Sequence, residues 1–461
     1  MIKSNSMGKG FKGYRWVICL LLFLATTTNY LDRQLLSMLS PELKELFSWS
    51  NQDYALILMA FTIFYGLFMA IAGPFIDRLG TKKGLFWAFV IWNVASAAHA
   101  LAPEIGIAIN PLVSLFGLTM STSVIGFMFM RAILGIGEAS MFPAAIKATA
   151  EWFPKKERSL CTGLFNSGTN VGAIIAPLIV TFVALQFGWR WAFVILGGIT
   201  LIWLIFWQIY YDSPFNMLKK GKITQEEYDY IHADDETDVA VEATDKNKVA
   251  WHKILKHPQT WAFAFGKFLT DGIWWFFLFW LPLYLSQAHG QSPAQIAIYV
   301  AAVFTMATFG SIFGGYLPSR LMKSGKDPYK ARMLAMFIIA LFPLVVLGAQ
   351  PLGAIHVLFP VILIGIGASA HQAWSANLFT TVSDMFPKKA VGSVVGFGGM
   401  MGATGSFLIH LVSGKLFDYH AALGQIEVGY GIMFIVCALA YLVAWVIMKV
   451  LVPKYKVIKE I

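Results

Sequence analysis

Long apolar runs alternate with short polar connections along almost the whole chain. A membrane-spanning helix needs about 20 predominantly apolar residues. The segment 103–118 is apolar as well, but it is expected to form an outer-side loop or a re-entrant piece rather than a further span. The pattern predicts an all-α polytopic membrane protein with twelve transmembrane helices, near 14–39, 51–75, 84–102, 119–147, 158–186, 190–211, 259–287, 293–318, 331–350, 355–382, 390–416 and 427–451.

One long polar stretch, residues 213–258, separates the first six predicted spans from the last six. It is rich in acidic residues, which is typical of a solvated linker. A short helix is expected inside it at Thr224–Ile231. The chain is therefore expected to comprise an N-terminal six-helix bundle (1–212), a cytoplasmic linker (213–258) and a C-terminal six-helix bundle (259–461).

The two halves repeat weakly. The tetrapeptide FPKK occurs at 153–156 and again at 386–389, an offset of 233 residues, and the same offset pairs Gly163 with Gly396. Both copies of the tetrapeptide follow the fourth span of their half. Repeats of this kind predict two pseudo-symmetric bundles with a substrate site near the membrane midplane between them.

Composition and charge agree with this architecture. Hydrophobic residues make up 57% of the chain and charged residues 13%, whereas a soluble domain carries about 25% charged residues. Lys and Arg concentrate in the two tails and the even-numbered connections, and the opposite side holds only Lys44, Arg190 and Lys415. This asymmetry places both termini in the cytoplasm, and it accounts for the net charge of +10 without a nucleic-acid partner.

The three cysteines lie isolated in apolar segments. Neither a disulfide framework nor a metal site is therefore expected.

Arg131 and Glu138 lie inside the fourth span, two helical turns and roughly 10 Å apart on nearly one face. Small residues separate them and allow neighbouring helices to approach closely. An ionised group at mid-membrane costs roughly 2.5–3.5 kcal/mol, so each must be paired or face a water-filled cavity. Arg131 offers a planar fork suited to a carboxylate, although a structural salt bridge with Glu138 or Asp32 is the alternative. Burial disfavours the charged form of Glu138, so it is predicted to exchange a proton; a structural carboxylic acid is the alternative.

Two further spans carry charges. Asp32 is a second candidate for proton coupling, and Arg33 is predicted either to anchor the substrate or to pair with a neighbouring helix. Lys267 and Asp271 stand at i and i+4, which favours an intrahelical ion pair over a role in lining the cavity.

A broader polar and aromatic set is predicted to contact the substrate, because such sites combine apolar walls with a few placed polar groups. The tryptophans at 274, 275 and 280 are instead expected to serve packing or the membrane interface. The predicted contact set is Tyr30, Tyr65, Asn166 and Thr169 in the first half and His371, Gln372, Trp374 and Asn377 in the second.

The connection between spans two and three, GPFIDRLGTKK at 73–83, resembles the loop motif of major facilitator transporters. The resemblance implies a conformational role, rather than substrate binding, for Gly73, Asp77, Arg78 and Gly80. In the second half, GYLPSR at 315–320 lacks the aspartate, so a lock at that point would have to work differently.

The segments YLDR at 30–33, Arg131 to Glu138, and EWFP at 151–154 resemble the anion:cation symporter family of the major facilitator superfamily. AHQAWSAN at 370–377, followed by SDMFP at 383–387, resembles its hexuronate branch, and the likeness covers essentially the whole chain. The resemblance implies a bacterial transporter of glucuronate or galacturonate in the inner membrane, with Tyr30, Tyr65 and Thr169 at the substrate.

The sequence thus predicts a proton-coupled symporter that imports a sugar-acid monocarboxylate, with another organic anion such as an aldonate as the alternative substrate. It carries neither a P-loop nor a Gly-rich dinucleotide turn. A membrane-embedded enzyme or sensor on the same fold is the alternative of another class. No cofactor is expected beyond the coupling proton, for which sodium is the alternative. The expected partners are the small-molecule substrate and the lipid bilayer, and the protein is expected to be a monomer.

Overall fold

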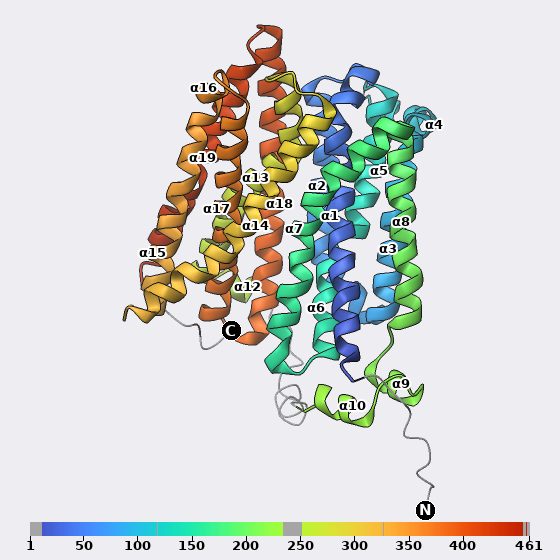
Figure 1. The fold of residues 1–461 in the computed structure, drawn as a ribbon, viewed down its shortest axis with the longest axis vertical. Helices are drawn as coiled ribbons and strands as arrows, with labels where there is room; N and C mark the ends of the chain where they lie inside the picture. Colours follow the sequence, from blue (N-terminus) through green and yellow to red (C-terminus); the bar gives the residue numbers. More distant parts are fainter. Residues whose placement is uncertain (1–11, 118, 234–250, 326, 455–457, 459–461) are drawn as a thin grey trace, which may run out of the picture.

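A computed structural model describes residues 12–117, 119–233, 251–325, 327–454 and 458. The helices form two bundles side by side, with the N-terminal half in blue to green and the C-terminal half in yellow to red (Figure 1). The N-terminal bundle contains α1 (Tyr14–Phe47), α2 (Asn51–Leu79), α3 (Thr81–Ala98), α5 (Thr122–Glu138), α6 (Met141–Trp152), α7 (Lys155–Phe187) and α8 (Trp189–Tyr210). The C-terminal bundle contains α13 (Pro258–Gln287), α14 (Pro293–Lys323), α15 (Pro328–Leu341), α17 (Leu358–Met385), α18 (Lys388–Ala422) and α19 (Ile426–Leu451).

Eleven helical segments within the described residues are long and apolar enough to cross a membrane. Helix α1 is not among them because threonines, Asn29, Asp32 and Arg33 interrupt its apolar run. It has 34 residues and packs lengthwise against α7. With α1, the twelve predicted spans are all present.

Prolines break two of the spans. Pro143 has no N–H to donate to the carbonyl of Ala139, and its ring crowds that carbonyl. The fourth span therefore divides at Ala139–Ser140 into α5 and α6. In the ninth span, Pro343 begins a 3-10 segment, Phe342–Gly348, which leads into the short helix α16 (Ala349–Gly353).

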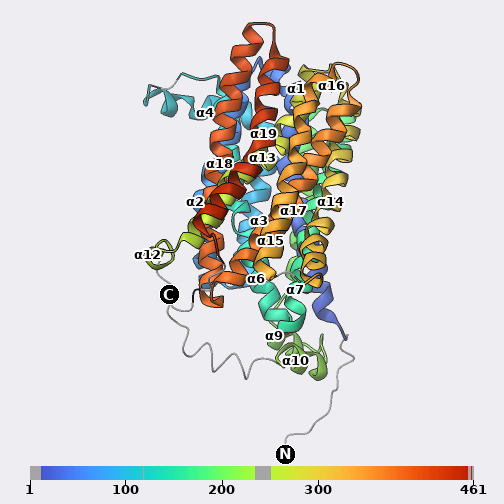
Figure 2. The same ribbon diagram turned by 90° about the vertical axis from the view of Figure 1, so that its left-hand side faces the viewer.

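Segment 103–118 is not a thirteenth span, as expected, but the loop expected there is wrong for most of the segment, which is helical. A 3-10 turn at His99–Leu101 leads directly into helix α4 (Ala102–Ser114). Figure 2 shows α4 projecting sideways from the bundle. It is held against α5 by Gly106 and Gly126, where an added Cβ would lie 1.7 Å from a backbone oxygen of the other helix. Two glycines thus permit a backbone contact that no side chain would allow.

The linker contributes helices at the end of the molecule where α1 begins and α19 ends, which we call the linker end (Figure 1). Helix α9 (Pro214–Lys219) was not predicted, whereas α10 (Gln225–Ile231), capped by Thr224, confirms the expected short helix. Arg15 donates to Glu227 at 2.8 Å and to Glu157 at 2.8 Å, which ties α10 to the starts of α1 and α7. The expected linker residues 234–250 lie outside the described residues.

The repeated FPKK tetrapeptide marks the same turn in both halves. Phe153 and Phe386 are the C-caps of α6 and α17, and Pro154 and Pro387 are the extended N-caps of α7 and α18. Proline cannot continue the preceding helix, and its fixed φ suits the start of the next. The sequence repeat is therefore a structural repeat.

The bundles contact each other through α2 with α18, α7 with α14, and α1 with α13. At the end opposite the linker, which we call the far end, an added Cβ on Gly414 of α18 would lie 2.6 Å from Ala55 of α2. Toward the linker end, Gly163 of α7 and Gly396 of α18 have no atom within 4 Å of such a position. The far end is therefore a place where backbone and side chains of the two bundles meet closely.

Candidate functional site

An ion pair between α1 and α5 lies at the centre of the site. Arg33 Nε donates to Glu138 Oε2 at 2.5 Å, and both side chains are buried. Glu138 is the last residue of α5, immediately before the break imposed by Pro143. Of the two alternatives predicted for Arg33, the structure shows the pairing with a neighbouring helix.

Aromatic rings from both bundles surround the Arg33 guanidinium. Its carbon lies 5.2 Å from the ring centre of Tyr30, 4.7 Å from that of Tyr65 and 5.5 Å from that of Trp275. A guanidinium over ring faces is stabilised by the ring quadrupole. Since Trp275 belongs to α13, this cluster spans the interface between the bundles. Two of its members, Tyr30 and Tyr65, were predicted from sequence.

Arg131 lies deeper in the N-terminal bundle and is 1% exposed. Its Nε and Nη1 have no hydrogen-bond partner among the residues that the structure describes. Neither of the salt bridges considered as alternatives is formed there: Glu138 pairs with Arg33, and Asp32 accepts from Trp92 and Ser96. A buried cation with unmatched donors is costly, so these donors are available to an anion.

The second oxygen of Glu138 is also unmatched. Glu138 Oε1 and the nearby Asn29 Nδ2 are buried without hydrogen-bond partners. Small residues permit this crowded arrangement: Gly135 of α5 lies against the backbone of Phe61 in α2, and Gly137 lies against Trp92 in α3. The expected close approach of neighbouring helices at these small residues is confirmed.

Asp32 is directed into the N-terminal bundle rather than toward its partner bundle. Its two oxygens accept from Trp92 Nε1 at 2.7 Å and from Ser96 Oγ at 2.7 Å, both on α3. It is 2% exposed. The carboxyl group is thus held by neutral donors, and its role in proton coupling stays a prediction.

On α7, Thr169 is nearly buried and its hydroxyl donates to the carbonyl of Asn166, one turn earlier. The Asn166 side chain is exposed. One turn from Asn166, Asn170 reaches across the interface to Gln372 of α17, with 3.5 Å between Nε2 and Oδ1. Gln372 is therefore the predicted second-half residue that contacts the opposite bundle.

The other predicted residues of α17 pack inside the C-terminal bundle. His371 Nδ1 lies 2.9 Å from the Tyr441 hydroxyl, and its ring stacks on Trp274. Trp374 is fully buried with Nε1 unpaired. Asn377 donates to the carbonyl of Gly314 at 2.7 Å. In this state these contacts link α17 to its own bundle, and the predicted roles at the substrate stay predictions.

Lys267 and Asp271 form the expected intrahelical ion pair at 2.6 Å. Asp271 also lies against Gly402 of α18, where an added Cβ would be 2.3 Å from its Oδ2. Trp275 is one further turn along the same face of α13. Sequence reasoning assigned Trp275 to packing, but its i+4 spacing from Asp271 was a signal that it faces the same way.

The loop motif between α2 and α3 lies at the linker end. Gly80 has φ 77°, a left-handed conformation that favours glycine, and it ends α2. Gly73 has open space beside its Cα, and Arg78 is exposed. The side chain of Asp77 lies outside what the structure describes, so its conformational role stays a prediction.

The fold and this buried charged site define a multi-pass membrane transporter rather than an enzyme. The family model of the Major Facilitator Superfamily matches residues 22–410, and the chain belongs to this family. It is 32% identical to the hexuronate transporter of Escherichia coli K12 over 444 residues, 95% of each chain. It is also 32% identical over 312 residues, 68% of this chain and 84% of the other, to the galacturonate transporter of Dickeya chrysanthemi. A D-galactonate transporter of Escherichia coli O6:H1 is 28% identical, with 87% and 89% covered.

Solved structures share the fold. A bacterial homologue of the human lysosomal transporter Spinster, in an inward-facing and occupied conformation, matches with a TM-score of 0.71 at 17% identity, covering 96% of this chain and 97% of the other. A D-xylose–proton symporter matches with a TM-score of 0.71 at 14% identity, covering 97% and 100%. At these identities the likeness establishes the architecture alone.

Proposed function

We propose that this transporter imports a sugar-acid monocarboxylate, specifically a hexuronate, together with a proton across the bacterial inner membrane by alternating access. In this proposal the linker end faces the cytoplasm, because Lys and Arg concentrate in the connections at that end. The names of the two relatives at 32% identity support the substrate class.

The single observation that carries the proposal is the unmatched Arg131. A buried guanidinium with two free donors, close to a ring of aromatic faces, lacks the anion that its geometry suits. The carboxylate of the substrate supplies this anion. The sugar ring then lies against Tyr30, Tyr65 and Trp275, because apolar sugar faces pack on aromatic rings. The sugar hydroxyl groups reach Gln372 and Asn170.

The ion pair of Arg33 with Glu138 supplies the coupling. While Glu138 is ionised it occupies the Arg33 guanidinium at 2.5 Å. Protonation removes its charge and weakens this contact, so Arg33 becomes a second donor to the substrate. Proton and anion therefore bind together, and their opposite charges cancel, so loading leaves the net charge that the carrier moves through the low-dielectric barrier unchanged.

An aldonate is the second candidate, which the relative that transports D-galactonate favours. An aldonate shares the carboxylate of a hexuronate but is open-chain, whereas a hexuronate can present a ring to the aromatic faces. Selectivity between the two would therefore be determined at Tyr30, Tyr65 and Trp275, while Arg131 would serve both.

The test is uptake into proteoliposomes containing the purified chain. Labelled glucuronate, galacturonate and galactonate are compared under an inward proton gradient, under a sodium gradient and without either. Proton-driven accumulation of an unchanged hexuronate, competed weakly by galactonate, is the expected result. Accumulation driven only by sodium, or conversion of the solute, would contradict the proposal. The same uptake is measured for Arg131→Ala, which removes the proposed ligand of the substrate carboxylate. Arg190→Ala is its matched control, because Arg190 is an exposed arginine paired with Glu104 at the far end.

A further inference from the structure

The far end is closed by hydrogen bonds between the bundles, and one of them depends on a proline. Pro282 lies within α13 and has no N–H. The carbonyl of Leu278, four residues earlier, therefore has no intrahelical donor. Ser37 of α1 supplies one: its hydroxyl lies 3.0 Å from the Leu278 oxygen and 3.1 Å from that of Phe279.

A second hydroxyl from the N-terminal bundle donates to the same turn of α13. Tyr54 of α2 donates to the carbonyl of Phe279 at 2.9 Å, and its ring packs edge-on against Trp280. Tyr54 and Ser37 are both fully buried. A buried carbonyl without a donor is costly, so the Leu278 carbonyl, which Pro282 deprives of its intrahelical donor, is satisfied here by Ser37 of the opposite bundle.

Nearer the tip of the far end, a carboxylate of the C-terminal bundle caps a helix of the N-terminal bundle. Asp418 of α18 accepts from the backbone N–H of Asn51 at 2.7 Å and of Gln52 at 2.8 Å. These are the first two residues of α2, whose own N-cap, Ser50, bonds the N–H of Asp53. Asp418 thus receives two of the N–H groups that a helix start leaves unmatched, and its charge complements the helix dipole.

Side chains extend this contact. The Asn51 Oδ1 atom accepts from Lys44 Nζ of α1 at 2.8 Å and from Gln287 Nε2 of α13 at 3.2 Å. The Tyr430 hydroxyl of α19 donates to Gln287 Oε1 at 2.8 Å. Asp418 and Asn51 therefore join helices of both bundles in one polar network.

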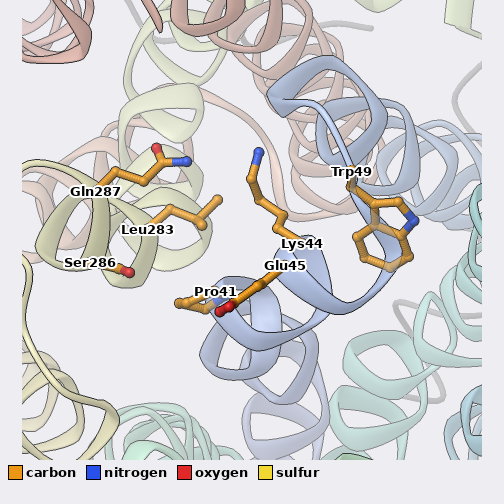
Figure 3. Close-up of a pocket in the computed structure, with 7 residues that line it drawn as sticks. All are labelled: Pro41, Lys44, Glu45, Trp49, Leu283, Ser286 and Gln287. Carbon is orange, nitrogen blue, oxygen red and sulfur yellow. The ribbon is translucent and has the colours of Figure 1, made fainter. Parts of the chain in front are cut away.

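The space beside this network is not filled by apolar packing. A cavity of about 280 Å³ lies between α1 and α13. Figure 3 shows the residues that line it: Pro41, Lys44, Glu45, Trp49, Leu283, Ser286 and Gln287. Close-packed side chains would hold the bundles together without hydrogen bonds. At this cavity the closure depends on the polar contacts instead.

We propose that these groups form a two-layer latch that stabilises the state closed at the far end. Its outer layer is Asp418 on the start of α2, and its inner layer is Ser37 and Tyr54 on the Leu278 and Phe279 carbonyls beside Pro282. Opening of the far end exchanges these donors and acceptors for water, because both layers join opposite bundles. The latch rests on alternating access within the proposed function, but its contacts are the same whichever anion the carrier transports and whichever ion is coupled to it.

The test measures the distance between the bundles at the far end without substrate. Spin labels are placed at Leu46 of α1 and Leu423 beyond α18, which are both 55% exposed. The native cysteines, which are all buried, are replaced by alanine. Pulsed electron resonance on the purified full chain then gives the populations of short and long distances.

Asp418→Asn keeps the size of the side chain but loses the charge, and it is expected to raise the long-distance population about tenfold relative to the short one. Glu45→Gln is the matched control, because Glu45 lines the cavity without joining the bundles. An unchanged distance distribution in Asp418→Asn would overturn the outer layer of the latch.

The inner layer has its own test. Tyr54→Phe and Ser37→Ala each remove a hydroxyl and are expected to raise the long-distance population, and their double variant more so. Pro282→Ala restores an N–H to α13, so Ser37→Ala should have a smaller effect in that background. An equal effect of Ser37→Ala with and without Pro282 would show that Ser37 does not replace the donor that Pro282 removes. A failure of substrate uptake with these distance changes intact would count against the proposed function and leave the latch standing.

Discussion

Glu138→Gln tests the coupling step most directly. The substitution keeps the shape of the side chain at the end of α5 and removes its charge. In the structure, Glu138 Oε2 accepts from Arg33 Nε at 2.5 Å, and Oε1 is unmatched beside Asn29. The amide oxygen can keep the contact with Arg33, but the contact becomes that of a neutral acceptor.

The expected magnitude follows from this single contact. A hydrogen bond to a charged group contributes about 1.5–3 kcal/mol, roughly twice that of a neutral pair. Ionised Glu138 competes with the substrate for Arg33. Removing its charge weakens the contact with Arg33 by about 1.4 kcal/mol, so the variant should bind the substrate about tenfold more tightly than the wild type at alkaline pH. In the wild type, substrate affinity is expected to fall as pH rises, because ionised Glu138 would occupy Arg33. In the variant it should be nearly independent of pH.

Two measurements on the same proteoliposomes decide whether Glu138 couples proton and substrate. Equilibrium binding of labelled glucuronate is measured at one acidic and one alkaline pH, beside accumulation driven by a pH gradient. Glu138→Gln should bind at both pH values and exchange labelled for unlabelled substrate, but it should not accumulate, because a permanently neutral group releases no proton. Glu104→Gln, at an exposed acid of the far end, is the control. Normal pH-driven accumulation by Glu138→Gln would refute the reasoning, and loss of binding would make Glu138 a substrate ligand or a structural partner.

Arg131→Lys should weaken substrate binding by about tenfold or more in equilibrium dialysis, since it loses the bidentate fork, and Arg131→Ala should abolish binding; near wild-type affinity in Arg131→Ala would exclude the clamp. Gly126→Val should prevent folding, because even a Cβ would lie 1.7 Å from a backbone oxygen of α4, while Gly163→Ala, with open space around it, should leave the melting temperature unchanged. Arg15→Ala should weaken the packing of α10 against the bundle by about 3 kcal/mol, because it removes the bonds of Arg15 to Glu227 and Glu157. Faster proteolysis of the linker would report this loss. Reporter fusions at 235 and 461 should report the cytoplasm, and fusions at 48 and 290 the outer side; a periplasmic signal at 235 would reverse the orientation.

Most of the fold could be predicted from the sequence because its signals are local. Apolar length identifies a span, and proline identifies a turn, so the positions of the spans and the FPKK turns at 153–156 and 386–389 were accessible. Residues 103–118 were misjudged for a reason of the same kind. Their apolar character fits lipid contact, but the contact that packs this helix against α5 is the meeting of Gly106 with Gly126. That contact joins two different helices, so no pattern of neighbouring residues in the sequence predicts it.

The charged residues of the site could be selected from sequence, but their partners could not. Arg131 and Glu138 share a helix face, which suggested a salt bridge between them, yet Glu138 pairs with Arg33 from α1. The break at Pro143 ends α5 directly after Glu138, and the side chain meets the neighbouring helix there. Asp32 precedes Arg33 in the chain, but a helix turns successive side chains about 100° apart, so Asp32 meets α3 instead.

The second bundle contributes to site and gate through one face of α13. Asp271, Trp275 and Phe279 follow one another at i+4 spacing. Asp271 pairs with Lys267, Trp275 lies over the Arg33 guanidinium, and the carbonyl of Phe279 receives the Tyr54 hydroxyl. A helix is stiff over two turns, so a displacement of Trp275 by a substrate also displaces the Phe279 carbonyl about 6 Å away along the axis. Pro282, directly beyond these positions, removes one hydrogen bond from α13. We therefore expect the site and the inner layer of the latch to move as one.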